Sequence, residues 1–274
     1  MYADTIKKCS ANAARIVDFA DKEKLGFWLS SAMAGAYVGL GIILIFTLGN
    51  MVDPSIRSLV MGGTFGIALT LVIIAGSELY TGHTMFLTFG VKTGQITLAD
   101  TLRVLPQTWA GNLIGSVGVA LLFFYAGGGK LLPDTNSLLN NVAMAKTSGS
   151  ATALLFKGIL CNWLVCLAIW MCQRVEGSAK FIAIWWCLLA FIASGYEHSI
   201  ANMTIFALSW FGEHKEAFTL AGIGHNLLWV TIGNTISGVV FMGLGYWFTT
   251  PKTQRPIIKS AKANASTATA TQTA

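Results

Sequence analysis

Six long apolar stretches alternate with shorter polar segments along the 274-residue chain. They cover residues 27–49, 59–91, 106–127, 151–172, 181–211 and 226–248. Four of them are close to the roughly 20 residues with which one helix crosses a bilayer. The second and fifth are too long for one ordinary crossing and too short for two. Each of these two therefore predicts a single span with a kinked or unwound middle.

Polar segments with a shared pattern interrupt the second and fifth stretches. Each contains a glycine, any one residue and a glutamate, which are Gly76 and Glu78 in the first segment and Gly195 and Glu197 in the second. Ionisable groups at membrane depth are costly and mark paths for ions or protons. The matching positions of the two segments therefore predict a transport site where the two breaks meet.

The chain divides into halves with three predicted spans each, on either side of a loop at 128–150. Because three is odd, repeated halves lie inverted in the membrane. The third span contains Gly111-Asn112 and the sixth contains Gly233-Asn234, where small residues permit close helix contact. Inverted halves with a broken helix in each are typical of transporters and channels, and the free N–H groups of half-helices favour an anion. We expect an all-α membrane protein with six transmembrane helices in two inverted three-helix repeats.

The composition supports a chain that crosses the membrane several times. Apolar residues make up 54% of the sequence and charged residues 11%, against roughly 25% charged residues in soluble domains. The mean hydropathy is +0.63. Lys and Arg are concentrated on the side of the membrane that holds both termini, so we expect both termini in the cytoplasm. Topology and contact with anionic lipid explain the net charge of +6, and we expect no nucleic-acid partner.

Three regions are expected along the chain. Residues 1–26 contain apolar positions at helical spacing over 3–21, which predicts an amphipathic helix lying on the cytoplasmic interface. Residues 27–249 form the six-span channel domain. Residues 250–274 are rich in Ala, Thr and Ser and predict a disordered cytoplasmic tail. We expect no cleavable signal peptide, because the first span is too long for one.

The five cysteines fall in apolar spans or in the first cytoplasmic segment. Their odd number and their spacing predict free, buried thiols, with no disulfide framework and no metal site. Nothing else in the pattern indicates a cofactor or an enzyme.

His198 is the strongest candidate for the chemistry of transport. A histidine beside a helix break can donate a hydrogen bond to a passing anion or transfer a proton to it. The alternative is a structural role, in which a neutral His198 forms hydrogen bonds with the backbone groups that the break leaves free. Thr81, in the first break, either hydrogen-bonds to His198 or caps the following half-helix. Asn202 is likewise a helix cap or a pore-lining donor.

The remaining candidates have a structural alternative as well. Glu78 and Glu197 resemble the carboxylates of a proton relay or cation site, but their charge would repel an anion, so we favour support of the broken backbone. Lys157, inside the fourth span, attracts anions or extends to the membrane edge. Four apolar residues flank the breaks and form either constrictions or ordinary packing: Phe65, Leu69, Leu79 and Phe191.

Three segments carry a resemblance to a known family. Residues 74–82 (IAGSELYTG) and 158–168 (GILCNWLVCLA) resemble the two signatures of the formate/nitrite transporter family, and residues 197–203 (EHSIANM) resemble its second break. The resemblance extends over residues 3–250, and in detail it is to the nitrite channels of enteric bacteria. Tyr80 departs from the phenylalanine or isoleucine usual in the family, which affects how that loop packs.

The resemblance implies an aquaporin-like fold and a homopentamer in which each subunit has its own pore. It places a central histidine on His198, a loop threonine on Thr81 and a lysine on Lys157, and it places the constrictions on the four apolar residues named above. The implied function is passive or proton-coupled passage of nitrite and other small monovalent anions across the bacterial inner membrane.

Other functions give different expectations. A formate or hydrosulfide channel of the same family would share these features. A water or glycerol channel of similar fold would need Asn-Pro-Ala at both breaks, and none of the five prolines lies there. A membrane redox subunit would use His83 and His198 as axial haem ligands. A structural scaffold gives no reason for an ionisable group at each break.

Overall fold

Helices make up most of residues 2–257, the part of the chain that the computed structural model describes. The elements, in order, are α1 (Ala3–Lys22), α2 (Lys24–Gly49), α3 (Arg57–Thr64), α4 (Gly66–Thr70), the π-helical η1 (Leu71–Gly76), α5 (Tyr80–Thr93), α6 (Leu98–Tyr125), α7 (Leu138–Thr147), α8 (Ala151–Cys172), α9 (Ala179–Ala193), α10 (Ser199–Phe211), α11 (Leu220–Ile236), the π-helical η2 (Ser237–Leu244), α12 (Gly245–Thr249) and the short turn η3 (Lys252–Gln254). The all-helical fold predicted from the sequence is confirmed.

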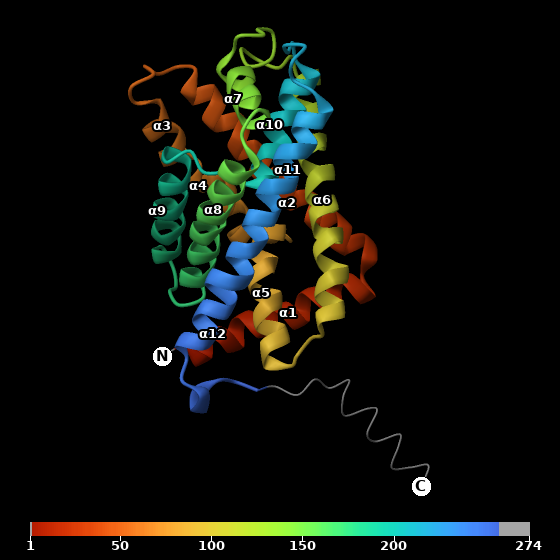
Figure 1. The fold of residues 1–274 in the computed structure, drawn as a ribbon, viewed down its shortest axis with the longest axis vertical. Helices are drawn as coiled ribbons and strands as arrows, with labels where there is room; N and C mark the ends of the chain where they lie inside the picture. The colour runs from red at the N-terminus through yellow and green to blue at the C-terminus, as the bar shows by residue number, and fades with distance from the viewer. Residues whose placement is uncertain (1, 258–274) are drawn as a thin grey trace.

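Five continuous helical segments in the described residues are long and apolar enough to cross a membrane, and the fifth predicted span consists of two shorter apolar helices, α9 and α10. The second predicted span is also divided, between η1, which ends at Gly76, and α5, which begins at Tyr80. In Figure 1, α3 and α4 lie in the upper part of the molecule and α5 in the lower part, so residues 57–93 cross it once. Both long stretches are therefore broken single spans, as the sequence pattern predicts.

The accessory helices α1 and α7 lie at opposite ends of the bundle, with α1 at the bottom of Figure 1 and α7 at the top. The apolar face of α1, which we expected at the lipid interface, is covered by protein: Ile6, Cys9, Ala13 and Ile16 are fully buried, and α1 packs mainly on α5. Residues 250–257 of the expected tail include η3. Residues 258–274 of that tail lie outside the described residues.

Equivalent helix pairs pack closely in the two halves, α2 on α6 and α8 on α11. The backbones touch where glycines remove the side chain. A Cβ atom on Gly115 would lie 1.7 Å from the carbonyl oxygen of Ala32, and one on Gly233 would lie 2.3 Å from that of Leu155. Close approach through small residues is how helices associate in lipid, where the hydrophobic effect does not drive them together.

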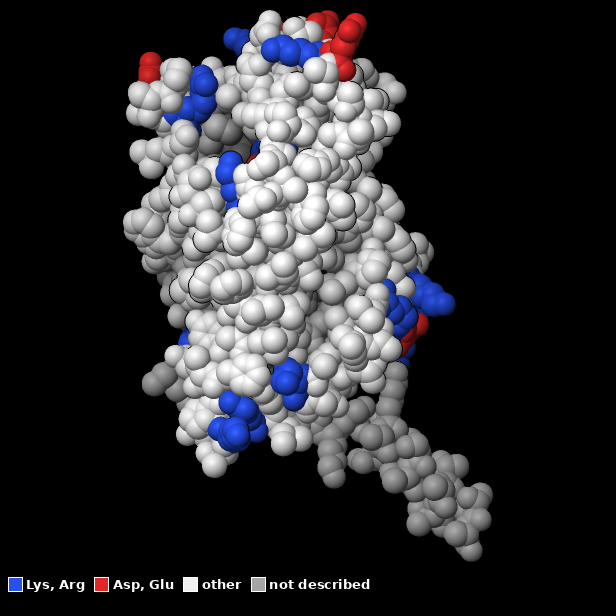
Figure 2. All heavy atoms as spheres, in the orientation of Figure 1, with Lys and Arg blue, Asp and Glu red and all other residues white. Residues whose placement is uncertain are grey.

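The surface in Figure 2 is uncharged over most of its middle height, and charged atoms gather mainly near the two ends. Large apolar side chains are exposed on the molecule, among them Leu122, Trp186 and Phe248. An exposed apolar patch of this extent is abnormal for a monomer in water and normal for a surface that faces lipid or another subunit.

We predict that Gly115→Ala destabilises the fold by about 1–3 kcal/mol, because the new methyl group collides with the α2 backbone rather than with a movable side chain. The measurement is the free energy of unfolding in bicelles. Gly118→Ala, on the same helix and with nothing within 4 Å of the added atom, is the matched control and should not destabilise. Equal destabilisation by both substitutions would contradict close packing of α2 on α6 at Gly115.

Candidate functional site

A glycine in the left-handed conformation ends the helix before each break. Gly76 has φ 86° and Gly195 has φ 68°, a region that other residues rarely adopt. In both, the next residue reaches back five positions along the helix: Ser77 N–H donates to the Val72 carbonyl and Tyr196 N–H to the Phe191 carbonyl, each at 3.1 Å. This is the Schellman ending of a helix, and it accounts for the glycine of the repeated pattern.

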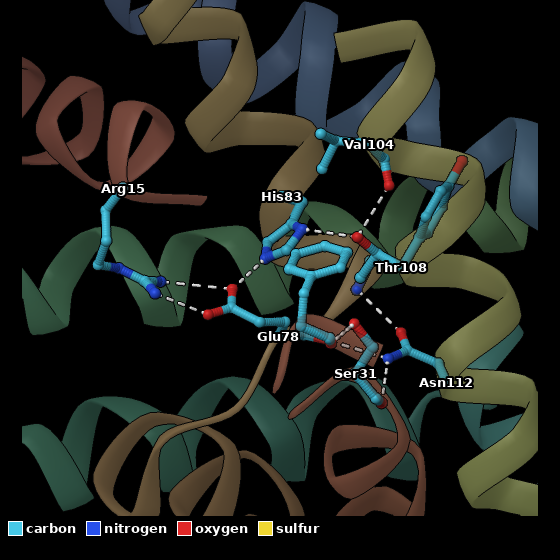
Figure 3. A network of polar contacts seen from close by, with 9 residues as sticks. Arg15, Ser31, Glu78, His83, Val104, Thr108 and Asn112 are labelled. Carbon is cyan, nitrogen blue, oxygen red and sulfur yellow. Dashed lines mark hydrogen bonds and ion pairs between the residues drawn. The ribbon is translucent and has the colours of Figure 1, made fainter. Parts of the chain in front are cut away.

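Two asparagines satisfy the backbone at the breaks, one in each half. Asn112 of α6 accepts from the Tyr80 N–H at 2.9 Å and donates to the carbonyls of Glu78 (2.9 Å) and Ser31 (2.8 Å). Figure 3 shows Asn112 directed at these groups. The contacts with Tyr80 and Glu78 replace backbone hydrogen bonds that the broken helix lacks at membrane depth, and the contact with Ser31 ties the break to α2.

Asn234 of α11 makes the same three contacts at the second break. It accepts from the Ser199 N–H at 2.9 Å and donates to the carbonyls of Glu197 (3.0 Å) and Gly158 (2.8 Å). The two asparagines occupy equivalent positions of the inverted repeat. The sequence signal for this role is the paired Gly-Asn motif, from which we predicted close helix contact but not the hydrogen bonds of the asparagines.

The two glutamates are each paired with a cation from an accessory helix. The Glu78 carboxylate forms an ion pair with Arg15 of α1 at 2.8 Å, and the Glu197 carboxylate forms one with Lys146 of α7 at 2.8 Å. Both glutamates are 4% exposed. Asn202 also donates to the Glu197 carboxylate, at 2.6 Å. The pairing offsets the negative charge beside the breaks, and sequence reasoning missed both cations because they lie far away in the chain.

His198 and Thr81 meet between the two breaks. His198 is the N-cap of α10, where its Nδ1 accepts from the Ala201 N–H at 3.2 Å. Its Nε2 lies 3.1 Å from the Thr81 hydroxyl. Since Nδ1 is an acceptor here, the hydrogen-bond network assigns the proton of the neutral ring to Nε2. The structure thus brings the two predicted residues together, with the ring oriented by the helix cap.

The backbone of Thr81 is held on its other side by α8. The Thr81 carbonyl accepts from Asn162 at 3.3 Å and from the Cys166 thiol at 3.4 Å, and also from the Thr84 hydroxyl at 2.6 Å. Asn162 donates to the Asn234 carbonyl as well, at 2.6 Å. One asparagine therefore ties the first break to the helix that supports the second.

Two cavities approach the breaks from opposite ends. The inner cavity, on the side of α1, has a volume of about 400 Å³ and is lined by Val72 and Leu79 among others. The outer cavity, on the side of α7, has a volume of about 320 Å³ and is lined by Phe191 and His198. No residue lines both. A path through the subunit must therefore pass the buried side chains between them.

The predicted apolar residues are divided between these positions. Leu79 and Phe191 line the inner and outer cavities respectively, whereas Phe65 and Leu69 line neither of them. All four are at most 4% exposed. Phe65 packs edge-on against Phe191, with ring centroids 5.5 Å apart, and Phe191 stacks near His198 at 6.1 Å.

Lys157 is exposed and lines the outer cavity, together with Lys146 and Arg57. Among the described residues, its side chain has no hydrogen bond or ion pair, and its backbone carbonyl accepts from the Glu197 N–H at 3.3 Å. Asn202, 1% exposed, lines the same cavity. His83 lines the inner cavity instead, so the two histidines of the haem alternative do not face one another.

The chain is similar to known proteins over most of its length. The model of the formate/nitrite transporter family matches residues 3–248. The chain is 73% identical to the nitrite transporter NirC of Escherichia coli, over 94% of this chain and 96% of that protein. It superimposes on a solved FNT family ion channel with a TM-score of 0.89 at 74% identity, covering 90% and 99% of the two chains. A pentameric formate channel with formate bound gives 0.72 at 25% identity, covering 84% and 98%.

We predict that Lys146→Met destabilises the protein by about 3–5 kcal/mol, because it leaves the Glu197 carboxylate buried without its cation. The free energy of unfolding in bicelles measures the loss. The double variant Lys146→Met/Glu197→Gln should recover much of it, since the orphaned charge is then gone.

Lys157→Met is the matched control, because this lysine lines the same cavity without an ion pair. Its expected effect is below about 1 kcal/mol. If the two lysine variants are equally stable, the Lys146 and Glu197 pair does not support the break.

Proposed function

The chain belongs to the formate/nitrite transporter family, and from this membership and the geometry of the breaks we propose that it conducts nitrite, and other small monovalent anions such as formate, across the bacterial inner membrane. It is a multi-pass membrane protein and not an enzyme. The observation that carries the proposal is the hydrogen-bonded pair of His198 and Thr81. His198 lines the outer cavity, and Thr81 is fully buried and lines neither cavity, so the pair lies at the barrier that separates the two cavities.

The first step of permeation is attraction of the anion to the outer cavity. Lys157 provides a cation there whose charge no acidic partner offsets among the described residues. A like-signed lining of a narrow cavity raises the local concentration of a counter-charged solute. Since Lys146 offsets Glu197, that carboxylate does not oppose the anion.

The second step is passage of the apolar barrier. Phe191 and Leu79 offer no hydrogen bonds, so a bare anion loses much of its hydration energy between the cavities. The Nε2–H of His198 and the hydroxyl of Thr81 are the polar groups that replace water there. While Nδ1 caps α10, His198 acts as a neutral hydrogen-bond donor, and protonating it would break the Ala201 hydrogen bond.

The functional unit in this proposal is a homopentamer with one pore in each subunit. The support is the solved relative described as a pentameric formate channel. The exposed apolar side chains of α9, which include Phe181, Ile182 and Trp186, are suited to contact with lipid or a neighbouring subunit.

We predict a pentamer in native mass spectrometry of the protein released from nanodiscs. A distribution of monomers, under conditions that keep a known pentameric relative intact, would contradict the assembly. That outcome would not contradict the proposal that each single subunit contains a pore.

We predict that proteoliposomes containing the wild-type protein take up nitrite faster than empty liposomes, and that His198→Ala lowers this flux roughly tenfold or more. The reason is that the buried anion loses its donor at the barrier. Flux is measured with a nitrite-sensitive electrode, in parallel with formate and chloride.

His214→Ala is the control, since this histidine lies in the loop between α10 and α11 and lines neither cavity. It should conduct like the wild type. The channel function fails if wild-type nitrite flux does not exceed that of empty liposomes, and the role of His198 fails if both alanine variants conduct equally.

A further inference from the structure

A second buried histidine, His83, has no part in the barrier described above. It lies in α5 on the inner side of the first break and is 3% exposed. Figure 3 shows it between Glu78, which carries the ion pair with Arg15, and Thr108 of α6. These residues come from four separate segments, and three of them, Arg15, Glu78 and His83, line the inner cavity.

Each ring nitrogen of His83 faces one polar group. Nε2 lies 2.7 Å from Glu78 Oε2, and Nδ1 lies 3.1 Å from the hydroxyl oxygen of Thr108. The same hydroxyl lies 3.0 Å from the Val104 carbonyl oxygen. A hydroxyl has one hydrogen to donate and can also accept, so its hydrogen points either to His83 or to Val104.

This arrangement satisfies two protonation states of the ring. In the neutral state, Nε2–H donates to Glu78 and the Thr108 hydroxyl donates to Nδ1. In the protonated state, Nδ1–H donates to Thr108 and the hydroxyl hydrogen turns to Val104. Only the hydroxyl hydrogen turns, and each ring nitrogen keeps its hydrogen-bond partner in both states, so the change of charge leaves no buried polar atom of the ring unsatisfied.

His198 lacks this freedom. Its Nδ1 accepts from the backbone N–H of Ala201, which is a fixed donor and cannot turn away. Protonation at that atom would place two hydrogens between the same two nitrogens. Of the two histidines at the breaks, His83 is therefore the one whose hydrogen-bond partners suit both the neutral and the protonated ring.

The charged surroundings of His83 follow from the helices packed against α5. Arg15 of α1 and Glu78 of the break are the ionisable groups beside it, and their charges offset one another. On the other sides, α6 presents Thr108 and η2 contains no ionisable residue. The Cys166 thiol of α8 contacts the Thr81 carbonyl instead. The network is thus neutral when His83 is neutral and carries one positive charge when it is protonated.

We propose that His83 is a proton-binding site of the inner cavity, and that its protonation is coupled to the binding of a small monovalent anion there. The proton comes from water in the inner cavity, forms the Nδ1–H bond and returns to that water when the anion leaves, so no bond of the protein breaks. Because coupling is reciprocal, the anion favours the protonated ring as much as the ring favours the anion. The identity of the anion rests on the proposed function, whereas the proton site does not.

The direct test is nitrogen-15 NMR of histidine-labelled protein in nanodiscs, with the His83 signals assigned by their loss in His83→Gln. We expect Nδ1 of His83 to gain a proton as the pH of the sample is lowered, because the Thr108 oxygen can accept its hydrogen bond. Sodium nitrite should move the midpoint to higher pH. A ring that keeps one protonation state throughout, or a midpoint that nitrite does not move, overturns the proposal.

Flux provides the second readout. In the wild type, nitrite uptake from the inner side should be about tenfold weaker at alkaline pH than at acidic pH, because the positive charge of the protonated His83 ring is then lost. His83→Gln should remove most of this pH dependence, and His214→Gln should retain it. An unchanged pH profile in His83→Gln counts against the coupling.

Substitutions at Thr108 test the same site in case His83→Gln does not fold. Thr108→Ser keeps the hydroxyl and should keep the wild-type midpoint. Thr108→Val removes the partner of Nδ1–H and should move the midpoint to lower pH, and equal midpoints in the two variants would overturn the role of the hydroxyl. If the wild type conducts no nitrite, the proposed function fails, while the titration of His83 without nitrite still decides the proton site.

Discussion

Backbone groups that cannot find a partner in lipid are the constraint on which this structure depends. Two of its spans break halfway, which frees N–H and carbonyl groups where no lipid atom can bind them. Asn112 and Asn234 supply the missing contacts, each accepting from the first amide of the following half-helix and donating to two carbonyls. Because the asparagines belong to unbroken helices, the breaks are fixed to the rigid part of each half.

Fixed breaks allow polar side chains to stand at membrane depth without opening the protein to water. Each break brings a carboxylate with it, and each carboxylate has a cation from a helix at the corresponding end of the bundle. The near-symmetry ends at the centre. Leu79 precedes α5 in the first half and His198 occupies the equivalent position before α10, so this position is apolar in one half and holds a hydrogen-bond donor in the other.

Much of this architecture follows from local sequence. The lengths of the apolar stretches predicted the broken spans. The repeated Gly-x-Glu pattern marked where the breaks lie, but that Gly76 and Gly195 end a helix with positive φ is seen only in the structure. The family resemblance pointed to His198 and Thr81. The contacts of Arg15 and Lys146 were not predictable, since each joins segments more than 50 residues apart and a lysine or arginine in a polar segment carries no local signal of its partner.

Amide hydrogen exchange in nanodiscs tests most directly whether each asparagine holds its own break, with Asn112→Ala and Asn234→Ala compared with the wild type. We expect protected Tyr80 and Ser199 amides in the wild type, and faster exchange by roughly tenfold or more only at the amide whose partner is removed. Exchange that is unchanged at both amides in both variants, or that rises equally at both, would show that the asparagines do not hold the breaks.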